Sequence, residues 1–424
     1  MRQTLTKLLY VVAAIVISGC STLDQPNNPE VVDGEMVVNF SQKMMKDILL
    51  KKGVIDGNST VFGYIAYAIP YTTTDESGKE VKVSGLMTVP DGMPEAVSTQ
   101  IGYSIVSDDH GTIFANIDAP TVFASSQNKP GGSAIIFTSM AGFVTLQPDY
   151  IGFGDSSDHY HPFILRKSLA NATVDFIKAA KSFAIKNGIK LNGQVFVTGY
   201  SEGGYAAMAT LQKIEADGEM TVDLTAPMAG PYALDPMAMG VLSKPKLSVP
   251  SFMANVAYAY AKTYNKPIAE IINEPYASML DKLFNGENNR TEIDPKLTQT
   301  TTGIDGLFVQ EFVTDFSQNP DNWFKKAVVE NNLHTWLPKS SVSLIHCIGD
   351  DVIPYAISEL TKGTMNHMAG LMGVSVDVSL VPVEVALTGD PATKLRYGHA
   401  ECAPKAYGVA AKLFGKIRKI KMGY

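Results

Sequence analysis

The sequence predicts an α/β fold, with a mostly parallel central sheet, helices on both faces and an inserted, mainly helical segment. Strand-like and helix-like segments alternate along most of the chain, which is typical of such a sheet. One buried strand leads directly through a glycine-flanked serine into a helix of small residues. About a hundred residues, 230–337, lack the alternation, as an insertion would. The 424 residues, 45% of them apolar, are enough for one large domain with an insertion.

The strands and helices are predicted from apolar periodicity and from turn residues. Segments 61–71 and 79–89 alternate and should form a hairpin, because turn residues separate them. Further strands are expected at 101–107, 144–150, 194–198, 221–227, 341–347 and 374–385, and helices at 169–186, 204–214, 358–372 and 400–420. These assignments divide the chain into a core, residues 39–229 and 338–424, and a helical cap, residues 230–337.

The first twenty residues have the pattern of an export signal. Arg2 and Lys7 precede an apolar run of ten residues, too short for a stable membrane span but suited to a signal-peptide core. The run ends in Ile17-Ser-Gly-Cys20, which resembles the lipobox of bacterial lipoproteins. The resemblance implies a signal peptide at 1–19, acylation of Cys20 and a polar tether at 20–38. A plain secretory signal with an accidental cysteine is the alternative.

This resemblance also implies a location. An exported bacterial lipoprotein is anchored in the lipid bilayer by its acyl chains, facing the periplasm or at the outer membrane. Ser21 favours the outer membrane, since an aspartate at that position would favour inner-membrane retention. The net charge of −7 argues against a nucleic-acid partner. No motif for a metal or cofactor is present, so none is expected, and the sequence indicates no oligomeric state.

The chemistry-bearing motif is Gly199-Tyr-Ser201-Glu-Gly203. In a Gly-x-Ser-x-Gly turn the serine lies on a sharp strand-to-helix bend, and the glycines leave room for its strained backbone. The helix that follows directs its positive end toward a developing oxyanion. A glycine-rich turn with an idle serine is the alternative, but the strand before and the small residues after Ser201 favour a nucleophile. Such a turn is characteristic of the α/β-hydrolase fold.

A serine nucleophile needs a base, and in this fold the order along the chain is serine, acid, histidine. Four histidines follow Ser201: His334, His346, His367 and His399. His399 is predicted to lie in a loop between the last strand and the last helix, where the base is needed. His367, inside a helical pattern, is the second candidate.

The acid is expected directly after the strand that ends at His346. Acid loops of this fold commonly read His-Gly-x-x-Asp-x-x-Val-Pro, and Pro354 sets that register on Asp350. Asp351 competes with it. In this register Asp351 would cap the next helix or hold the loop.

Together the motifs resemble the secretory lipases, in particular their bacterial lipase-like relatives, over about residues 60–415. The resemblance rests on ordered motifs: Tyr71-Thr-Thr-Thr-Asp-Glu-Ser-Gly, Val83-Ser-Gly-Leu-Met-Thr-Val-Pro, His110-Gly-Thr, Gln147-Pro-Asp-Tyr-Ile-Gly-Phe-Gly-Asp, Gly199-Tyr-Ser-Glu-Gly-Gly and Ala229-Gly-Pro-Tyr. It implies hydrolysis of acyl esters, hence a small-molecule ester substrate, with a helical cap over an apolar acyl site and no cofactor.

The oxyanion hole should use two backbone N–H groups. One belongs to Glu202, the residue after the nucleophile, and the other to Thr112 or Gly111 in the loop after the third strand. Asp108, just before that loop, is expected to face the surface without a role. Alternatively, its charge favours a polar or cationic substrate.

Setting Cys20 aside, Cys347 and Cys402 form an even pair, either one disulfide or two buried thiols. Cys347 lies three residues before Asp350, and Cys402 three residues after His399. Because the acid and histidine loops must meet in space, we hypothesise a disulfide that braces them.

The sequence thus predicts a serine carboxylic-ester hydrolase that works through an acyl-enzyme on Ser201. Two alternatives remain. One is a serine peptidase of the prolyl-peptidase type, although only about forty residues precede the first strand, too few for a propeller of repeats. The other is a non-catalytic surface lipoprotein. Most aromatic residues of the cap should form its own core, and a few should line an acyl groove.

Overall fold

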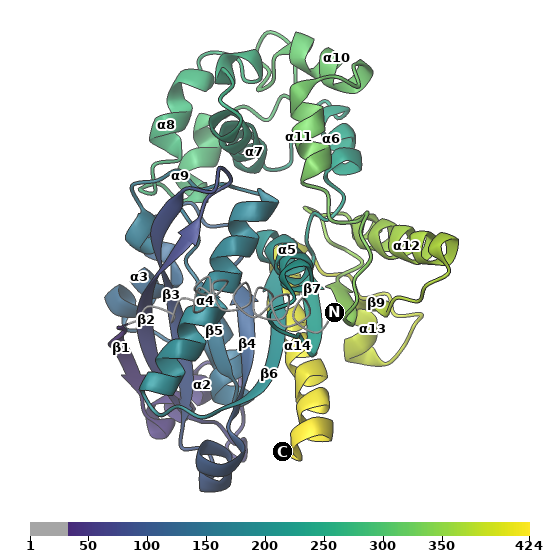
Figure 1. The fold of residues 1–424 in the computed structure, drawn as a ribbon. Helices are drawn as coiled ribbons and strands as arrows, with labels where there is room; N and C mark the ends of the chain where they lie inside the picture. The colour runs from purple at the N-terminus through teal and green to yellow at the C-terminus, as the bar shows by residue number, and fades with distance from the viewer. Residues whose placement is uncertain (1–32) are drawn as a thin grey trace, which may run out of the picture.

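A central sheet of nine strands organises the molecule (Figure 1). The computed structural model describes residues 33–424. The strand order is β1-β2-β3-β5-β4-β6-β7-β8-β9. Pairs from β5 through β4 to β9 are parallel, and the pairs that join β1, β2, β3 and β5 are antiparallel. The prediction of a mostly parallel sheet surrounded by helices is confirmed.

The predicted signal peptide and the lipobox cysteine Cys20 lie outside the described residues. Within residues 33–424, no helix has the length and apolar character needed to cross a bilayer. Because Cys20 lies outside the described residues, the acyl anchor stays a prediction.

The strands are β1 (Glu35–Phe40), β2 (Gly63–Thr74), β3 (Glu80–Asp91), β4 (Tyr103–Asp109), β5 (Val144–Pro148), β6 (Leu191–Tyr200), β7 (Leu224–Met228), β8 (Val342–His346) and β9 (Val378–Pro382). The helices of the core are α2 (Gln42–Lys51), α3 (Pro120–Gln127), α4 (Arg166–Lys186), α5 (Glu202–Asp217), α12 (Tyr355–Met372), α13 (Val383–Thr388) and α14 (His399–Met422). Those between β7 and β8 are α6 (Leu234–Leu242), α7 (Pro250–Thr263), α8 (Leu280–Leu283), α9 (Arg290–Ile293), α10 (Gln310–Gln318) and α11 (Trp323–Glu330).

Neighbouring residues of a central strand serve the two faces of the sheet, because side chains alternate along a strand. On β4, Ile105 packs in a cluster with Phe176 of α4. The next residue, Val106, belongs to a different cluster that includes Phe414 of α14. Helices therefore cover both faces, and the sheet in between is buried on each side.

The N-terminal edge of the fold was predicted incorrectly. Residues 35–38, assigned to the tether, belong to β1, which pairs antiparallel with β2. Val38 and Phe40 are buried there. A strand this short, with two buried side chains, gives too weak a pattern to detect before its partner is known. Helix α2 follows, with Ser41 Oγ accepting from the N–H of Met44 at its start.

The last strand is also shorter than predicted. The segment expected to be extended over 374–385 forms β9 only from Val378 to Pro382, and then turns into helix α13. Proline lacks the N–H needed to continue a ladder, but it is well placed just before a helix. Pro382 accounts for the switch.

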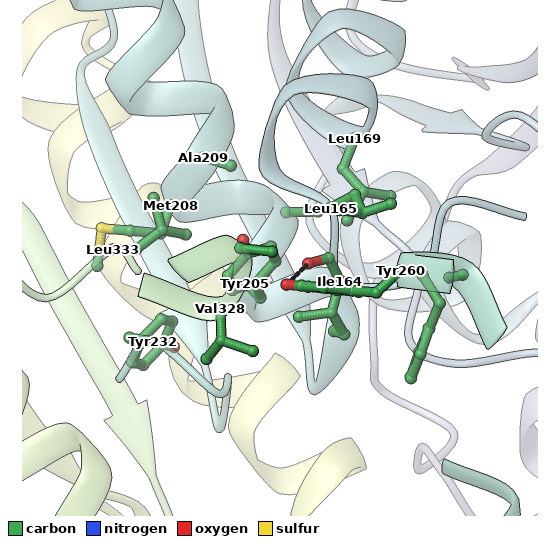
Figure 2. Packing of buried hydrophobic residues seen from close by; sticks show 14 of the residues in the cluster. Ile164, Leu165, Leu169, Tyr205, Met208, Ala209, Tyr232, Tyr260, Val328 and Leu333 are labelled. Atoms are coloured by element: carbon green, nitrogen blue, oxygen red, sulfur yellow. Dashed lines mark hydrogen bonds between the residues drawn. The ribbon is translucent and has the colours of Figure 1, made fainter. Parts of the chain in front are cut away.

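The predicted cap is helical and contributes no strand to the sheet over residues 230–337, all of which are described. It lies at the top of the molecule in Figure 1, above α5. Figure 2 shows how it joins the core: Tyr205 of α5, Tyr260 of α7 and Val328 of α11 lie in one buried cluster. The Tyr260 hydroxyl donates to the carbonyl of Ile164 at 3.1 Å. The cap and the core thus share one continuous apolar interior.

Candidate active site

Ser201 lies at the junction of β6 and α5 with backbone angles φ 61° and ψ −120°. A non-glycine residue rarely adopts this conformation, and it persists only when its surroundings enforce it. Its N–H donates to the carbonyl of Met228, and its carbonyl accepts from Tyr205, the fourth residue of α5. The serine is therefore fixed on a strained turn between the sheet and a helix N-terminus.

The flanking glycines are required by close backbone contacts. A Cβ atom on Gly203 would lie 1.8 Å from the carbonyl oxygen of Asp109, and one on Gly199 would lie 2.3 Å from the carbonyl oxygen of Gly203. No side chain fits at either position. The spacing seen in the sequence is thus imposed by the contact of this turn with β4.

Asp350 and His399 are brought together from segments 49 residues apart. The Nδ1 atom of His399 lies 2.7 Å from Oδ2 of Asp350, whose side chain is fully shielded from solvent. His399 is the first residue of α14, not a residue of the preceding loop as predicted. With Nδ1 held by the carboxylate, Nε2 is the nitrogen left for chemistry.

His399 lies beside the turn that holds Ser201. Its ring centroid is 4.9 Å from that of Tyr200, and the Tyr200 hydroxyl donates to the His399 carbonyl at 2.7 Å. Among the described residues no hydrogen bond joins Ser201 Oγ directly to His399. Such contacts are often long in an empty site and shorten when substrate binds.

A second histidine contacts the same carboxylate. His346 Nε2 lies 3.3 Å from Asp350 Oδ2 and 3.0 Å from the carbonyl of Ile353, while its Nδ1 lies 2.7 Å from Ser358 Oγ. Burial by itself raises the pKa of Asp350, but the hydrogen bonds and charges of His346 and His399 outweigh burial and hold that pKa well below its ordinary value. Asp350 is therefore ionised at neutral pH.

Two further carboxylates position the loops. Asp351 Oδ1 accepts from the backbone N–H of His399 at 2.8 Å, so Asp351 holds the histidine segment while Asp350 contacts the ring. The buried Glu384 accepts from the N–H groups of Ile348 and Tyr397, one on each loop. Sequence reasoning missed Glu384, because a lone glutamate in an apolar segment gave no sign of these partners.

The other two candidate histidines lie elsewhere. His367 is exposed on α12, and His334 is buried within the cap. Neither makes a hydrogen bond to Asp350 in the part of the chain that is described. The geometry therefore favours His399 over His367.

Cys347 and Cys402 form a disulfide that closes 55 residues of chain. Both are fully buried, and they lie next to the acid loop and at the start of α14. The bond ties together the segments that carry Asp350 and His399.

Replacing both cysteines with serine should lower the free energy of unfolding by about 2–4 kcal/mol, because the open chain regains entropy when unfolded. Urea denaturation of oxidised wild type and the double variant measures the difference. The single variant Cys402→Ser is expected to lose as much free energy of unfolding as the double variant. Equal stability of the double variant and the wild type would show that the bond adds nothing.

Glu202 begins α5, and its N–H is among the first of the helix, which have no acceptor within the helix. Its buried side chain contacts His161, with Oε1 2.7 Å from Nε2. The His161 Nδ1 atom faces the carbonyl of Ile151 at 2.8 Å, so Nδ1 carries a proton and donates it. Sequence reasoning used only the N–H of Glu202 and missed this pair.

Gly111 and Thr112 both lie near the nucleophile. A Cβ atom on Gly111 would be 2.9 Å from the carbonyl oxygen of Tyr200 and 3.8 Å from Ser201 Cβ. Thr112 lines the same cavity as Ser201. That the N–H of Thr112 or of Gly111 completes an oxyanion hole stays a prediction.

A cavity of about 290 Å³ opens over Ser201. Its walls are mainly apolar and come mostly from the cap, including Leu234, Met237, Phe252, Phe308, Phe312 and Phe324. Thr112, Ser201 and Glu202 line it from the core side. Within residues 33–424, no group of three or more His, Cys, Asp and Glu side chains is placed to hold a metal ion.

Asp108 is buried, contrary to the prediction that it faces the surface. It is 1% exposed, with its Oδ2 atom 3.5 Å from the hydroxyl of Tyr407 on α14. The next residue, Asp109, is also buried and accepts a hydrogen bond from Thr173 Oγ1 of α4 at 2.6 Å. Adjacent strand residues point to opposite faces, so both carboxyls enter the interior. Burial raises the pKa of Asp108 to about 7.

This raised pKa predicts that Asp108 weakens the fold as pH rises. In the unfolded chain its pKa is about 4, so between about pH 4 and 7 the unfolded state loses a proton that the folded state keeps. Stability should fall over that window by a few kcal/mol, roughly 3. Asp108→Asn should remove this loss, so its advantage over wild type in urea denaturation grows from pH 4.5 to pH 7.5. Asp47→Asn, on the exposed side of α2, serves as the control. A constant difference across pH would contradict the assignment.

A model of the prolyl oligopeptidase family matches residues 132–216, which include Ser201 but neither Asp350 nor His399. Among curated proteins no sequence matches significantly. The family match covers the strand, turn and helix around the serine.

Solved structures match over nearly the whole chain. A candidate hydrolase from Legionella pneumophila has a TM-score of 0.78 at 22% identity, covering 92% of this chain and 99% of its own. The rice cell wall degrading esterase LipA from Xanthomonas oryzae has a TM-score of 0.72 at 21% identity, with coverage of 92% and 98%. Candida antarctica lipase A is more distant, with a TM-score of 0.56, 14% identity and coverage of 83% and 76%. The chain has the α/β-hydrolase fold.

Proposed function

We propose that the protein is a serine hydrolase of carboxylic esters, with Ser201 as nucleophile, His399 as base and Asp350 as orienting acid. One observation carries the proposal. The Asp350–His399 contact of 2.7 Å lies next to a serine held in a strained turn at a helix N-terminus. A base held by an ionised acid, beside a serine that lines a cavity, is what acyl transfer needs.

In the proposed reaction His399 Nε2 takes the proton of Ser201 Oγ as the oxygen attacks the ester carbonyl. Asp350 keeps the proton on Nδ1 and stabilises the imidazolium. The N–H of Glu202, with that of Thr112 or Gly111, binds the oxyanion. His399 then gives its proton to the departing alcohol, leaving an acyl-enzyme. Water, deprotonated by His399, attacks the acyl-enzyme and releases the acid and free Ser201.

The cavity supports an ester with an apolar acyl part. Its volume of about 290 Å³ is at the lower end of the range for small-molecule sites, about 300–1,000 Å³. Its phenylalanine and leucine side chains offer no partner for the amide groups of a peptide, which would be costly to bury there. We therefore favour an acyl chain of medium length that extends from Ser201 into the cap.

A serine peptidase of the prolyl-peptidase type is the second candidate. The family model that matches residues 132–216 favours it. That segment holds the turn around the serine, which esterases and peptidases can share. The cavity, in contrast, is where the substrate would bind, and its apolar walls favour the ester.

The test is an assay of p-nitrophenyl esters of increasing acyl length against aminoacyl-prolyl amides. We expect ester hydrolysis with an optimum at medium length, and loss of activity in Ser201→Ala. A fluorophosphonate should label Ser201 and no other serine, as peptide mass spectrometry would show. Faster cleavage of the prolyl amides than of the esters would establish the peptidase. If neither substrate class is turned over and no serine is labelled, the protein is a non-catalytic lipoprotein.

We also propose that the chain is anchored as a lipoprotein through Cys20. The support is the sequence pattern of residues 1–20 alone. In a bacterial host Cys20→Ser should move the protein from the membrane fraction to the soluble periplasmic fraction. Metabolic labelling with palmitate should mark the wild type only, and unchanged fractionation with no label in the wild type would exclude the anchor.

A further inference from the structure

Four charged residues line the cavity over Ser201: Glu202, Lys244, Lys246 and Asp351. Glu202 contacts His161, and Asp351 accepts from the backbone of His399, so both carboxylates already have partners. The ammonium groups of the two lysines form no ion pair or hydrogen bond with any residue in 33–424. Both lysines are exposed. The cavity therefore has uncommitted positive charge.

The segment that carries these lysines is held in place. It follows α6 and runs beside residues 299–301, where the N–H of Leu247 donates to the carbonyl of Gln299 at 2.7 Å. The N–H of Thr301 donates to the carbonyl of Pro245 at 3.1 Å. The backbones of Lys246 and Thr300 pair in an isolated antiparallel β-bridge. Leu247 is buried, and its side chain anchors the segment in the apolar interior. The backbone that carries the lysines is thus held at the cavity wall.

An ammonium group at the wall of an apolar cavity attracts an anion, and because both lysines are exposed this attraction weakens as the salt concentration rises. Ammonium groups donate strong hydrogen bonds to carboxylate or phosphate oxygens. The lysine stems can also cover apolar surface while the charged ends reach water. Away from the N–H groups beside Ser201, the two lysines are the cationic side chains of the wall, so they decide where a second anionic group can lie.

We propose that Lys244 and Lys246 bind an anionic group that the substrate carries away from its scissile ester. This inference rests on the proposed function and narrows its substrate class. The preferred substrate is an ester with an apolar acyl part of medium length and a carboxylate or phosphate at its far end.

The experiment compares p-nitrophenyl monoesters of dicarboxylic acids with their methyl-capped neutral counterparts, at equal chain length and in monomeric solution. Wild type should favour the anionic ester, mainly through KM. In the double variant Lys244→Met/Lys246→Met, which keeps the apolar stems, the anionic-to-neutral ratio of kcat/KM should fall about tenfold. The control is Lys266→Met/Lys282→Met, two exposed cap lysines that do not line the cavity, and it should keep the wild-type ratio.

Two further arms separate the outcomes. Titration calorimetry of Ser201→Ala with a dicarboxylic acid and with its monomethyl ester measures anion binding without turnover, so it tests the lysines even if no ester is cleaved. A neutral ester presented in anionic and in zwitterionic vesicles tests whether the lysines serve a membrane surface instead. An equal ratio in wild type and Lys244→Met/Lys246→Met, or a lysine effect confined to anionic vesicles, would overturn the proposal.

Discussion

Replacing His399 with alanine is expected to lower kcat for ester hydrolysis by about 10⁴- to 10⁶-fold. The hydroxyl of Ser201 is a poor nucleophile until a base removes its proton. Two histidines contact the shielded Asp350, and of these His399 lies beside the Ser201 turn. His346 is fully buried and both of its ring nitrogens already have partners, so it is not available as a substitute base. Steady-state kinetics with a p-nitrophenyl ester would measure the loss.

His367→Ala is the matched control for this experiment. His367 also follows Ser201 in the chain, but it is exposed on α12 and makes no contact with Asp350. Its removal should leave kcat and KM within about twofold of wild type, as for a surface substitution away from the site. Circular dichroism should show that both variants are folded. If His367→Ala loses activity and His399→Ala keeps it, the assignment of the base is wrong.

Gly203→Ala is expected to destabilise the protein by at least about 4 kcal/mol, or to prevent folding, because the added methyl group has no space. The new Cβ would lie 1.8 Å from the carbonyl oxygen of Asp109 and 2.8 Å from that of His110. These are backbone atoms of β4 and of the loop after it, so they cannot swing away as a flexible side chain could. Thermal and urea denaturation would report the loss.

The same substitution at Gly408, in the middle of α14, provides the contrast. Apart from its chain neighbours and the nearby backbone of its own helix, no heavy atom lies within 4 Å of a Cβ placed there. Alanine favours a helix over glycine by about 1 kcal/mol, so Gly408→Ala should be neutral or stabilising. If Gly203→Ala unfolds at the wild-type urea concentration, β4 cannot lie as close to the turn as the structure has it.

Much of the architecture could be predicted because its signals are local. Strand-like and helical periodicity predicted β2 through β8 and helices α4, α5, α12 and α14 to within a few residues. The strand, turn and helix around Ser201 were predicted by the same local logic. Asp350 and His399 lie much further along the chain. They were predicted from the motif register and from the order of elements in this fold. The structure places them 2.7 Å apart.

What the sequence by itself determined, then, are features set by neighbours along the chain: periodicity, turn residues and the glycines around Ser201. Only the tertiary structure decided which distant groups meet. It placed His346 and His399 on one carboxylate, gave Glu384 its partners on two loops, and buried Asp108. The physical reason is that burial, and with it the pKa and pairing of a polar group, depends on surfaces contributed by remote segments. No local pattern records those surfaces.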